Sequence, residues 1–234
     1  MSGAPVHRLN KKEIIWLANH KCKHSMSYLE HFRCYETEVL KGRKYEAGKD
    51  KLPIDQKVGY FDIEASNLTS SFGIILCYCI KDADSDIIYS DCVTKEDLQT
   101  DLDKNVVKSC IEDLKRFDRV IGYYSTKFDI PYTRSRAVVH NLPFGVFGSL
   151  LHTDCYYIVK HKFKLHSNRL ETAYETLVGP SYKTPIKPAI WIKALQGDKD
   201  SLNFIVDHCQ RDVHMLQELY EKISDFSRRK DTSI

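Results

Sequence analysis

The stretch GYFDIEAS, residues 59–66, decides how the fold of this chain is interpreted. Its aromatic and β-branched side chains favour a β-strand, and a turn-prone segment at 52–56 precedes it. Side chains alternate along a strand, so Asp62 and Glu64 point to the same face. Two neighbouring carboxylates repel each other, and burial would add to the cost. The sequence therefore raises the question of what neutralises this pair.

The composition is that of a globular protein, with 234 residues, 42% hydrophobic and 29% charged. The net charge of +3 is too small to indicate nucleic-acid binding by itself. Its distribution is uneven, since residues 1–51 carry a net charge of +5 and the remainder −2. We therefore expect a basic N-terminal extension, 1–51, that ends in a linker at 41–53, and one larger domain, 52–234.

Neither a secretion signal nor a membrane span is expected. The N-terminus lacks the apolar stretch of a signal peptide, and the longest apolar run, at 72–80, is too short to span a bilayer. Eight cysteines then predict thiols or metal ligands in a reducing compartment. We expect a cytoplasmic protein that does not bind membranes.

Periodicity predicts a mixed α/β order of elements. Three strands form an antiparallel meander, and a helix follows with apolar residues at Leu98, Leu102, Val106, Cys110 and Leu114. A fourth strand precedes a helix near Pro131, which suits a first helical turn. The expected strands are 59–66, 72–81, 86–93, 119–124 and a strand or strand–helix junction at 150–159; the other helices are 95–117, 168–178, 188–196 and 201–226.

Two further stretches carry acidic residues beside apolar ones. In GYYSTKFDIPY (122–132), Asp129 follows a strand and precedes Pro131, so it lies at a strand end or a helix entry. In DHCQRDVHM (207–215), His208 and Asp212 are four residues apart on a helix and share one face. Asp129 could instead be a helix N-cap, and Asp212 could form a salt bridge with a neighbour.

The motifs D-x-E, F-D-x-P-Y and a helical x-D-V, in this order, resemble the exonuclease domain of the DEDD superfamily. The resemblance covers roughly residues 55–225 and is strongest to the proofreading domain of family B DNA polymerases and its stand-alone relatives. It implies a ribonuclease H-like fold, a mixed β-sheet of about five strands flanked by helices, with a small N-terminal extension.

The resemblance also implies a site with two Mg²⁺ or Mn²⁺ ions held by Asp62, Glu64, Asp129 and Asp212. Asp62 would contact both ions, Glu64 and Asp212 the one that binds the attacking water, and Asp129 the second. The repulsion between Asp62 and Glu64 becomes tolerable when a cation lies between them.

The sequence departs from the family pattern at two positions. Subfamilies have a tyrosine four residues before the last aspartate or a histidine five residues before it, whereas here His208 occupies the tyrosine position. We expect His208 to be the general base or to orient the water; alternatively, it donates to a phosphate or is a packed surface histidine. Tyr124 lies where polymerase-like domains often carry an asparagine that holds the substrate strand.

Family resemblance also implies that residues after Glu64 approach the terminal nucleotide, although a plain turn would explain them equally well. These expected substrate contacts are Ala65, Asn67 and Leu68, with Ser66 between them, and Tyr124. Two groups of basic residues either follow the phosphates or form a solvated face. They are Lys160, Lys162, Lys164 and Arg169, and Lys183, Lys187 and Lys193 beside Trp191.

The basic extension contains Cys22, His24, His31 and Cys34 in the spacing C-x-H-x6-H-x2-C. An extended segment followed by a helix would place the two pairs facing each other, as in a tetrahedral structural Zn²⁺ site. His20 is a spare candidate. Alternatively, the cysteines pack inside and the histidines are polar surface residues.

The function expected from the sequence is a metal-dependent 3′–5′ exonuclease that hydrolyses DNA, with single-stranded ends favoured and no attached polymerase domain. Two alternatives stay open: an endonuclease or RNA-degrading enzyme on the same fold, and an inactive nucleic-acid-binding module. Nucleic acid, DNA or RNA, is the expected partner, and the sequence does not indicate protein partners.

Overall fold

The structure is a computed structural model that describes residues 11–35, 56–183 and 185–227. The chain divides into two compact units, Met1–Gln56 and Lys57–Ile234. The first contains helices α1 (Lys11–Asn19) and α2 (Phe32–Cys34). The linker predicted at 41–53 lies outside the described residues. The second unit contains the sheet and all the acidic residues singled out above.

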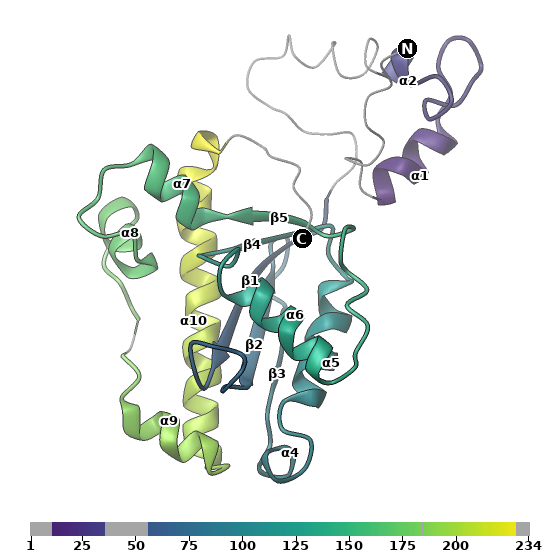
Figure 1. Ribbon diagram of the computed structural model, residues 1–234. Coiled ribbons are helices and arrows are strands. Elements are labelled where there is room, and N and C mark those ends of the chain that lie inside the picture. Colours follow the sequence, from purple (N-terminus) through teal and green to yellow (C-terminus); the bar gives the residue numbers. More distant parts are fainter. Residues whose placement is uncertain (1–10, 36–55, 184, 228–234) are drawn as a thin grey trace. The chain divides into compact units, whose positions relative to one another are not determined.

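A five-stranded mixed sheet forms the centre of the second unit, in the order β3-β2-β1-β4-β5 (Figure 1). β1 pairs antiparallel with β2 and β2 antiparallel with β3, whereas β4 lies parallel to both β1 and β5. This arrangement confirms the predicted sheet. The strands are β1 (Val58–Ala65), β2 (Ile75–Asp82), β3 (Ile88–Cys92), β4 (Arg119–Gly122) and β5 (Leu151–Asp154).

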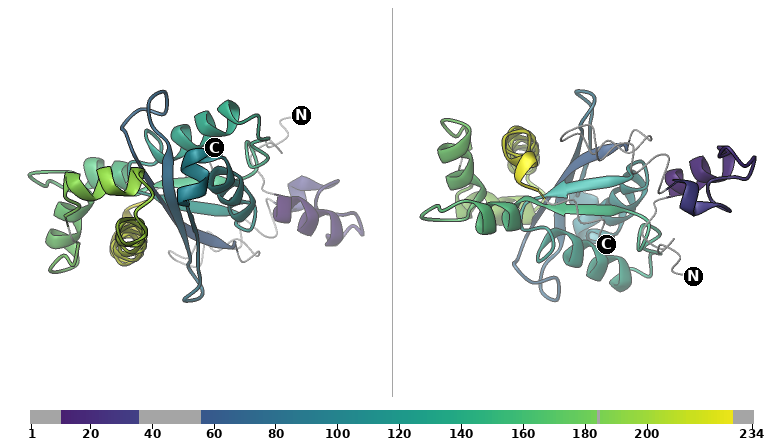
Figure 2. Two further views of the ribbon diagram at one scale, coloured as in Figure 1. Left: turned by 90° about the horizontal axis from the view of Figure 1, so that it is seen from below. Right: turned by 90° about the horizontal axis from the view of Figure 1, so that it is seen from above.

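Helices cover both faces of this sheet (Figure 2). Helix α10 (Lys199–Ile223) packs on β1 and β2 from one side, and α5 (Lys104–Leu114) and α6 (Asp129–Val139) lie on the other. Strand β2 is accordingly buried along its whole length, including Cys77 and Cys79. The remaining elements are α4 (Lys95–Gln99), α7 (Cys155–Lys162), α8 (Leu170–Leu177), α9 (Pro188–Leu195) and the 3-10 helix η3 (Ser224–Phe226).

The prediction of one continuous helix over 95–117 is wrong, because the chain breaks between α4 and α5. Thr94 and Asp97 form a reciprocal capping box at the start of α4. Leu102 then has a positive φ of 57° and remains 43% exposed, although its spacing suggested a core position. The break frees the Asp103 carboxylate for contacts outside its own helix.

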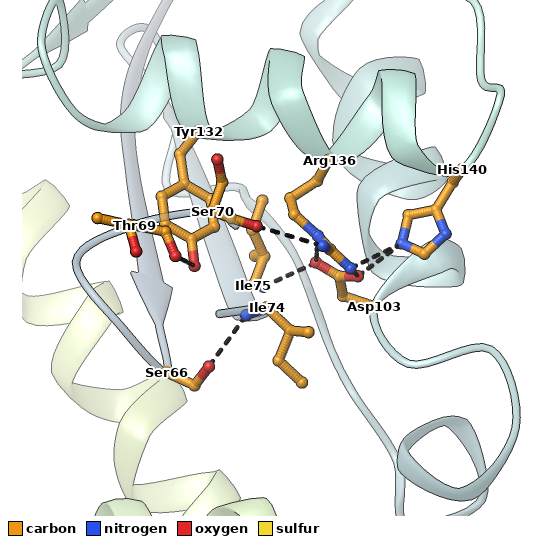
Figure 3. Close-up of polar contacts among 9 residues, drawn as sticks. All are labelled: Ser66, Thr69, Ser70, Ile74, Ile75, Asp103, Tyr132, Arg136 and His140. Atoms are coloured by element: carbon orange, nitrogen blue, oxygen red, sulfur yellow. Dashed lines mark hydrogen bonds and ion pairs between the residues drawn. The ribbon is translucent and has the colours of Figure 1, made fainter. Parts of the chain in front are cut away.

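Asp103 joins three elements of the core (Figure 3). Its carboxylate accepts hydrogen bonds from the Ile75 amide (2.8 Å), from Arg136 Nη2 (2.6 Å) and from Arg136 Nε (2.8 Å), and it lies 2.6 Å from His140 Nε2. Burial alone would raise the pKa of Asp103, but these hydrogen bonds lower it. The buried ion pair thereby fixes α6, whose first residue is Asp129, against the start of β2.

The predicted strand–helix junction at 150–159 is present, with β5 ending at Asp154 and α7 starting at Cys155. Asp154 caps α7 by accepting a hydrogen bond from the Tyr156 amide at 3.0 Å. It also accepts hydrogen bonds from the Tyr124 and Thr126 amides, which fixes the turn between β4 and α6. Within the described residues, no helix has both the length and the apolar character needed to cross a membrane.

Candidate active site

Strand β1 holds Asp62 and Glu64 on the face that α10 covers. In the register with β2, Asp62 lies opposite Cys79 and Glu64 opposite Cys77, so small side chains surround the two acids. The Cys209 thiol, from α10, donates a hydrogen bond to Asp62 Oδ2 at 3.4 Å. Burial raises the pKa of Cys209 well above its ordinary value, so this group stays a protonated donor. The predicted shared face is therefore present and is half-buried.

Asp129 is tied directly to the backbone between these two acids. It is the first residue of α6, it is 3% exposed, and its Oδ1 accepts a hydrogen bond from the Ile63 amide at 3.0 Å. The carboxylate thus points from the helix start toward the middle of β1. This contact explains why an aspartate at a helix entry does not serve as a simple surface cap.

His208 and Asp212 approach the same place from α10. Both are buried, and His208 Nε2 lies 3.7 Å from Glu64 Oε1 and 4.0 Å from Asp212 Oδ2. Lys183 Nζ pairs with the same Asp212 oxygen. Burial alone would lower the pKa of Lys183, but the charge of Asp212 raises it. Lys183 therefore places a positive charge among the acids.

One pocket of about 380 Å³ brings the five predicted catalytic residues together. Besides Asp62, Glu64, Asp129, His208 and Asp212, its lining includes side chains from the turn after β4, from the segment that leads to α9 and from α9 itself. These are Tyr123, Tyr124, Phe128, Lys183, Pro185, Ile186 and Trp191.

Burial and electrostatic repulsion raise the pKa values of three of these acids. Burial, with the charges of Asp129, Asp212 and Glu64, raises the pKa of Asp62 well above its ordinary value. Burial and the charge of Asp212 raise the pKa of Glu64 to about 8. Burial raises the pKa of Asp129 to about 7 despite the hydrogen bond from the Ile63 amide. Fully ionised, the four acids would carry more negative charge than Lys183 can neutralise, so without a further cation the cluster binds protons near neutral pH.

The donor set fits divalent cations. Carboxylate oxygens are the ligands that Mg²⁺ and Mn²⁺ prefer. Ligand atoms of Glu64, His208 and Asp212 lie within 4.8 Å of one another. Asp212 Oδ1 is buried and accepts no hydrogen bond from any group in the described part of the chain, which leaves it available to a cation.

The expected substrate contacts divide into two groups. Tyr124 lines the pocket, is 46% exposed and has a φ of +61°. Ala65, Asn67 and Leu68 do not line the pocket. Ala65 is the last residue of β1 and lies at a register shift, and Leu68 is 85% exposed. The Asn67 Oδ1 atom accepts a hydrogen bond from the Thr69 amide. A role of these three in binding substrate stays a prediction.

Among the basic residues, only part of one predicted group lies in the pocket, namely Lys183 with Trp191. The sequence did not predict the ion pair of Lys183 with Asp212. It also did not predict that Tyr123 lines the pocket or that Cys209 donates to Asp62. Tyr123 donates a hydrogen bond to the Asn168 carbonyl at 2.7 Å. The tyrosine pair in GYY was the available signal for the pocket wall. The sequence indicated Lys183 as one of a group of basic residues, but nothing in it indicated the ion pair with Asp212.

Comparison with known proteins places the chain in a family. Residues 59–224 match the RNase_H_2 model of the RNase H superfamily, so the chain belongs to that superfamily and has its nuclease fold. Among solved structures, it resembles the family B DNA polymerase from the hyperthermophilic archaeon Pyrobaculum calidifontis. The TM-score is 0.60 and the sequence identity is 20%. The match covers 75% of this chain and 25% of the polymerase, so this chain spans about a quarter of the polymerase's length. The comparison with curated proteins finds no match.

Proposed function

We propose that this protein is a metal-dependent 3′–5′ exonuclease that hydrolyses phosphodiester bonds of DNA. The observation that carries the proposal is the convergence of Asp62, Glu64, Asp129, His208 and Asp212 in one pocket, from three separate elements of the sheet and its helices. Membership of the RNase H superfamily supports a nuclease, and the likeness to a family B DNA polymerase supports the fold.

Asp62 is the central acid of the proposed site. The charges of Asp129, Asp212 and Glu64 all act on its carboxyl group, and all four acids line the same pocket. It would contact both of two Mg²⁺ or Mn²⁺ ions, with Glu64 and Asp212 on one side and Asp129 on the other. When bound, such ions activate a water molecule and stabilise the leaving oxygen of the phosphodiester.

His208 would hold and deprotonate the attacking water. Its Nε2 lies between Glu64 and Asp212, which are the two acids expected on the water side. The aromatic residues Tyr124 and Trp191 on the pocket wall offer faces on which terminal bases stack, a contact that tolerates any base. This arrangement favours an unpaired 3′ end over a duplex.

The test is a time course on 5′-labelled single-stranded DNA with Mg²⁺, with Mn²⁺ and with a chelator. Stepwise shortening from the 3′ end in the presence of metal is expected. Asp62→Asn should abolish it, whereas Asp207→Asn, an exposed carboxylate beside His208 on the same helix, should leave it unchanged. Activity that survives in Asp62→Asn would refute the proposal.

Parallel substrates separate the alternatives. Cleavage of circular single-stranded DNA would indicate an endonuclease, and faster degradation of an RNA oligomer would indicate a ribonuclease. Salt-sensitive binding with no cleavage of any substrate would indicate an inactive binding module.

A further inference from the structure

The described part of the N-terminal unit buries few apolar side chains. Among residues 11 and 14–35, the buried side chains are Leu17, Cys22, Cys34 and Tyr35, and two of these are thiols. Folded segments of fewer than about 40 residues usually need a metal, a disulfide or a partner to be stable. A bound metal would add stability to residues 11–35, where few apolar groups are buried.

A tight turn brings Cys22 and His24 together. The Cys22 amide donates to the Met26 carbonyl at 2.9 Å, and the Ser25 amide donates to the Cys22 carbonyl at 2.9 Å. Ser25 has a positive φ of 61°, and Lys21 and Ser27 form an antiparallel bridge that closes the turn. The prediction that Cys22 and His24 share one side of an extended segment is replaced by this turn.

The following segment returns His31 and Cys34 to the same point. Ser27 and Glu30 exchange hydrogen bonds, which fixes the turn before α2. The His31 amide donates to the Ser27 carbonyl, and the Cys34 amide donates to the His31 carbonyl, both at 2.9 Å. Cys34 ends α2 and is 5% exposed.

The four side chains converge through their ligand atoms. Cys22 Sγ lies 3.8 Å from His24 Nδ1 and 3.5 Å from His31 Nδ1, and Cys34 Sγ lies 3.2 Å from His24 Nδ1. All four ligand atoms lie within 4.8 Å of one another. Tetrahedral bonds of about 2.3 Å to sulfur and about 2.05 Å to nitrogen separate such atoms by roughly 3.6 Å. The observed separations surround this value.

We propose that Cys22, His24, His31 and Cys34 bind one structural Zn²⁺ ion. Four protein ligands complete a tetrahedral shell and leave no position for substrate, which is the arrangement of a structural site. Binding releases the thiol protons of both cysteines, so the two thiolates balance the charge of the ion. The proposal is independent of the nuclease activity.

His20 is not part of this site, although it is close in sequence. Its Nδ1 lies 2.9 Å from the Trp16 carbonyl oxygen, and its ring stacks on Trp16 with 4.0 Å between the ring centroids. His20 therefore provides a matched control for the histidine ligands. Cys92, half-buried on β3, provides the control for the cysteine ligands.

The experiment measures zinc in the full chain after purification without chelator, and cobalt absorption after exchange. Roughly one zinc per chain and a tetrahedral Co²⁺ spectrum with thiolate charge-transfer bands are expected. Cys22→Ser and His31→Ala should lose the metal, whereas Cys92→Ser and His20→Gln should keep it. His24→Cys should keep the metal and strengthen the charge-transfer band by about half, since it adds a third thiolate.

Tryptophan fluorescence gives a second readout that does not depend on activity. The chain has two tryptophans, and in a Trp191→Phe background Trp16 reports on the N-terminal unit alone. Chelation should change its emission and lower its thermal transition, and added Zn²⁺ should restore both. A wild-type chain that takes up no zinc or cobalt, or a Cys22→Ser chain that binds it as wild type does, would overturn the proposal.

Discussion

Replacing Glu64 by glutamine should stabilise the metal-free protein at high pH while it removes activity. The Glu64 side chain is 14% exposed and its pKa is raised to about 8, chiefly by burial and then by the charge of Asp212. A group whose pKa is higher in the folded state contributes stability below its unfolded pKa, and that contribution is lost as the pH rises through the folded value. For Glu64, the loss falls between its ordinary pKa of 4.5 and about 8.

The magnitude follows from the size of the shift. A pKa that rises from 4.5 to about 8 on folding means that ionising Glu64 destabilises the folded state by at most about 5 kcal/mol. Neighbouring acids share the excess charge and water relaxes around it, so we expect about half, ~2–3 kcal/mol. For a chain of this size, Glu64→Gln should then raise the melting temperature by about 5–10 °C at about pH 9, and by little at about pH 5.

The assay is thermal unfolding followed by circular dichroism, in chelator, at both pH values. Glu175→Gln, an exposed residue on α8, is the control and should melt like the wild type at each pH. Added Mg²⁺ should stabilise the wild type at high pH and have a smaller effect on Glu64→Gln, because the ion binds the acid that was replaced. A variant that melts below the wild type at about pH 9, or whose advantage is equal at both pH values, would refute the reasoning.

Substitutions at three other positions test further ionised groups, two in the pocket and one in the core. Asp129→Asn should still accept the hydrogen bond from the Ile63 amide and keep the fold, but its nuclease rate should fall by at least about 100-fold. Asp129→Ala should lose the hydrogen bond as well, and denaturant titration should show a loss of about 1–3 kcal/mol of stability. Lys183→Met should lower the stability of the metal-free protein by about 1–3 kcal/mol at neutral pH, and Mg²⁺ should restore it, because Asp212 loses its cation. Asp103→Asn should cost about 2–4 kcal/mol at neutral pH, measured in urea. Its deficit should shrink as the pH falls through the folded pKa of Asp103, which lies below 3.8, because the wild type then loses the same ion pair with Arg136.

The sheet and the acidic residues could be predicted because periodicity specifies them. Alternation along β1 places Asp62 and Glu64 on one face, and the helical repeat of α10 places His208 above Asp212. Both patterns depend on local geometry that the fold does not change. Pro131 predicts a helix start and therefore predicts Asp129 at a helix entry; in the structure Pro131 lies in the first turn of α6.

The break between α4 and α5 could not be predicted, because the apolar spacing continues through it. Leu102 fits the helical repeat, but its backbone adopts a positive φ and its side chain is exposed. The reason lies in Asp103, which bonds Arg136 on α6 and the Ile75 amide at the start of β2. Such contacts join residues far apart in the sequence, and a local pattern carries no information about them.

Lys183 shows the same limit at the pocket itself. The acids lie on a strand, on a helix start and in the middle of a helix, where the core fixes the backbone. Lys183 lies in an irregular segment before α9, where no repeat predicts the path of the chain. Its ammonium nevertheless pairs with Asp212, the acid whose second oxygen has no hydrogen-bond donor among the described residues. A cation that binds Asp212 therefore competes with one flexible side chain on a loop, and the strand and helices that hold the other acids need not move.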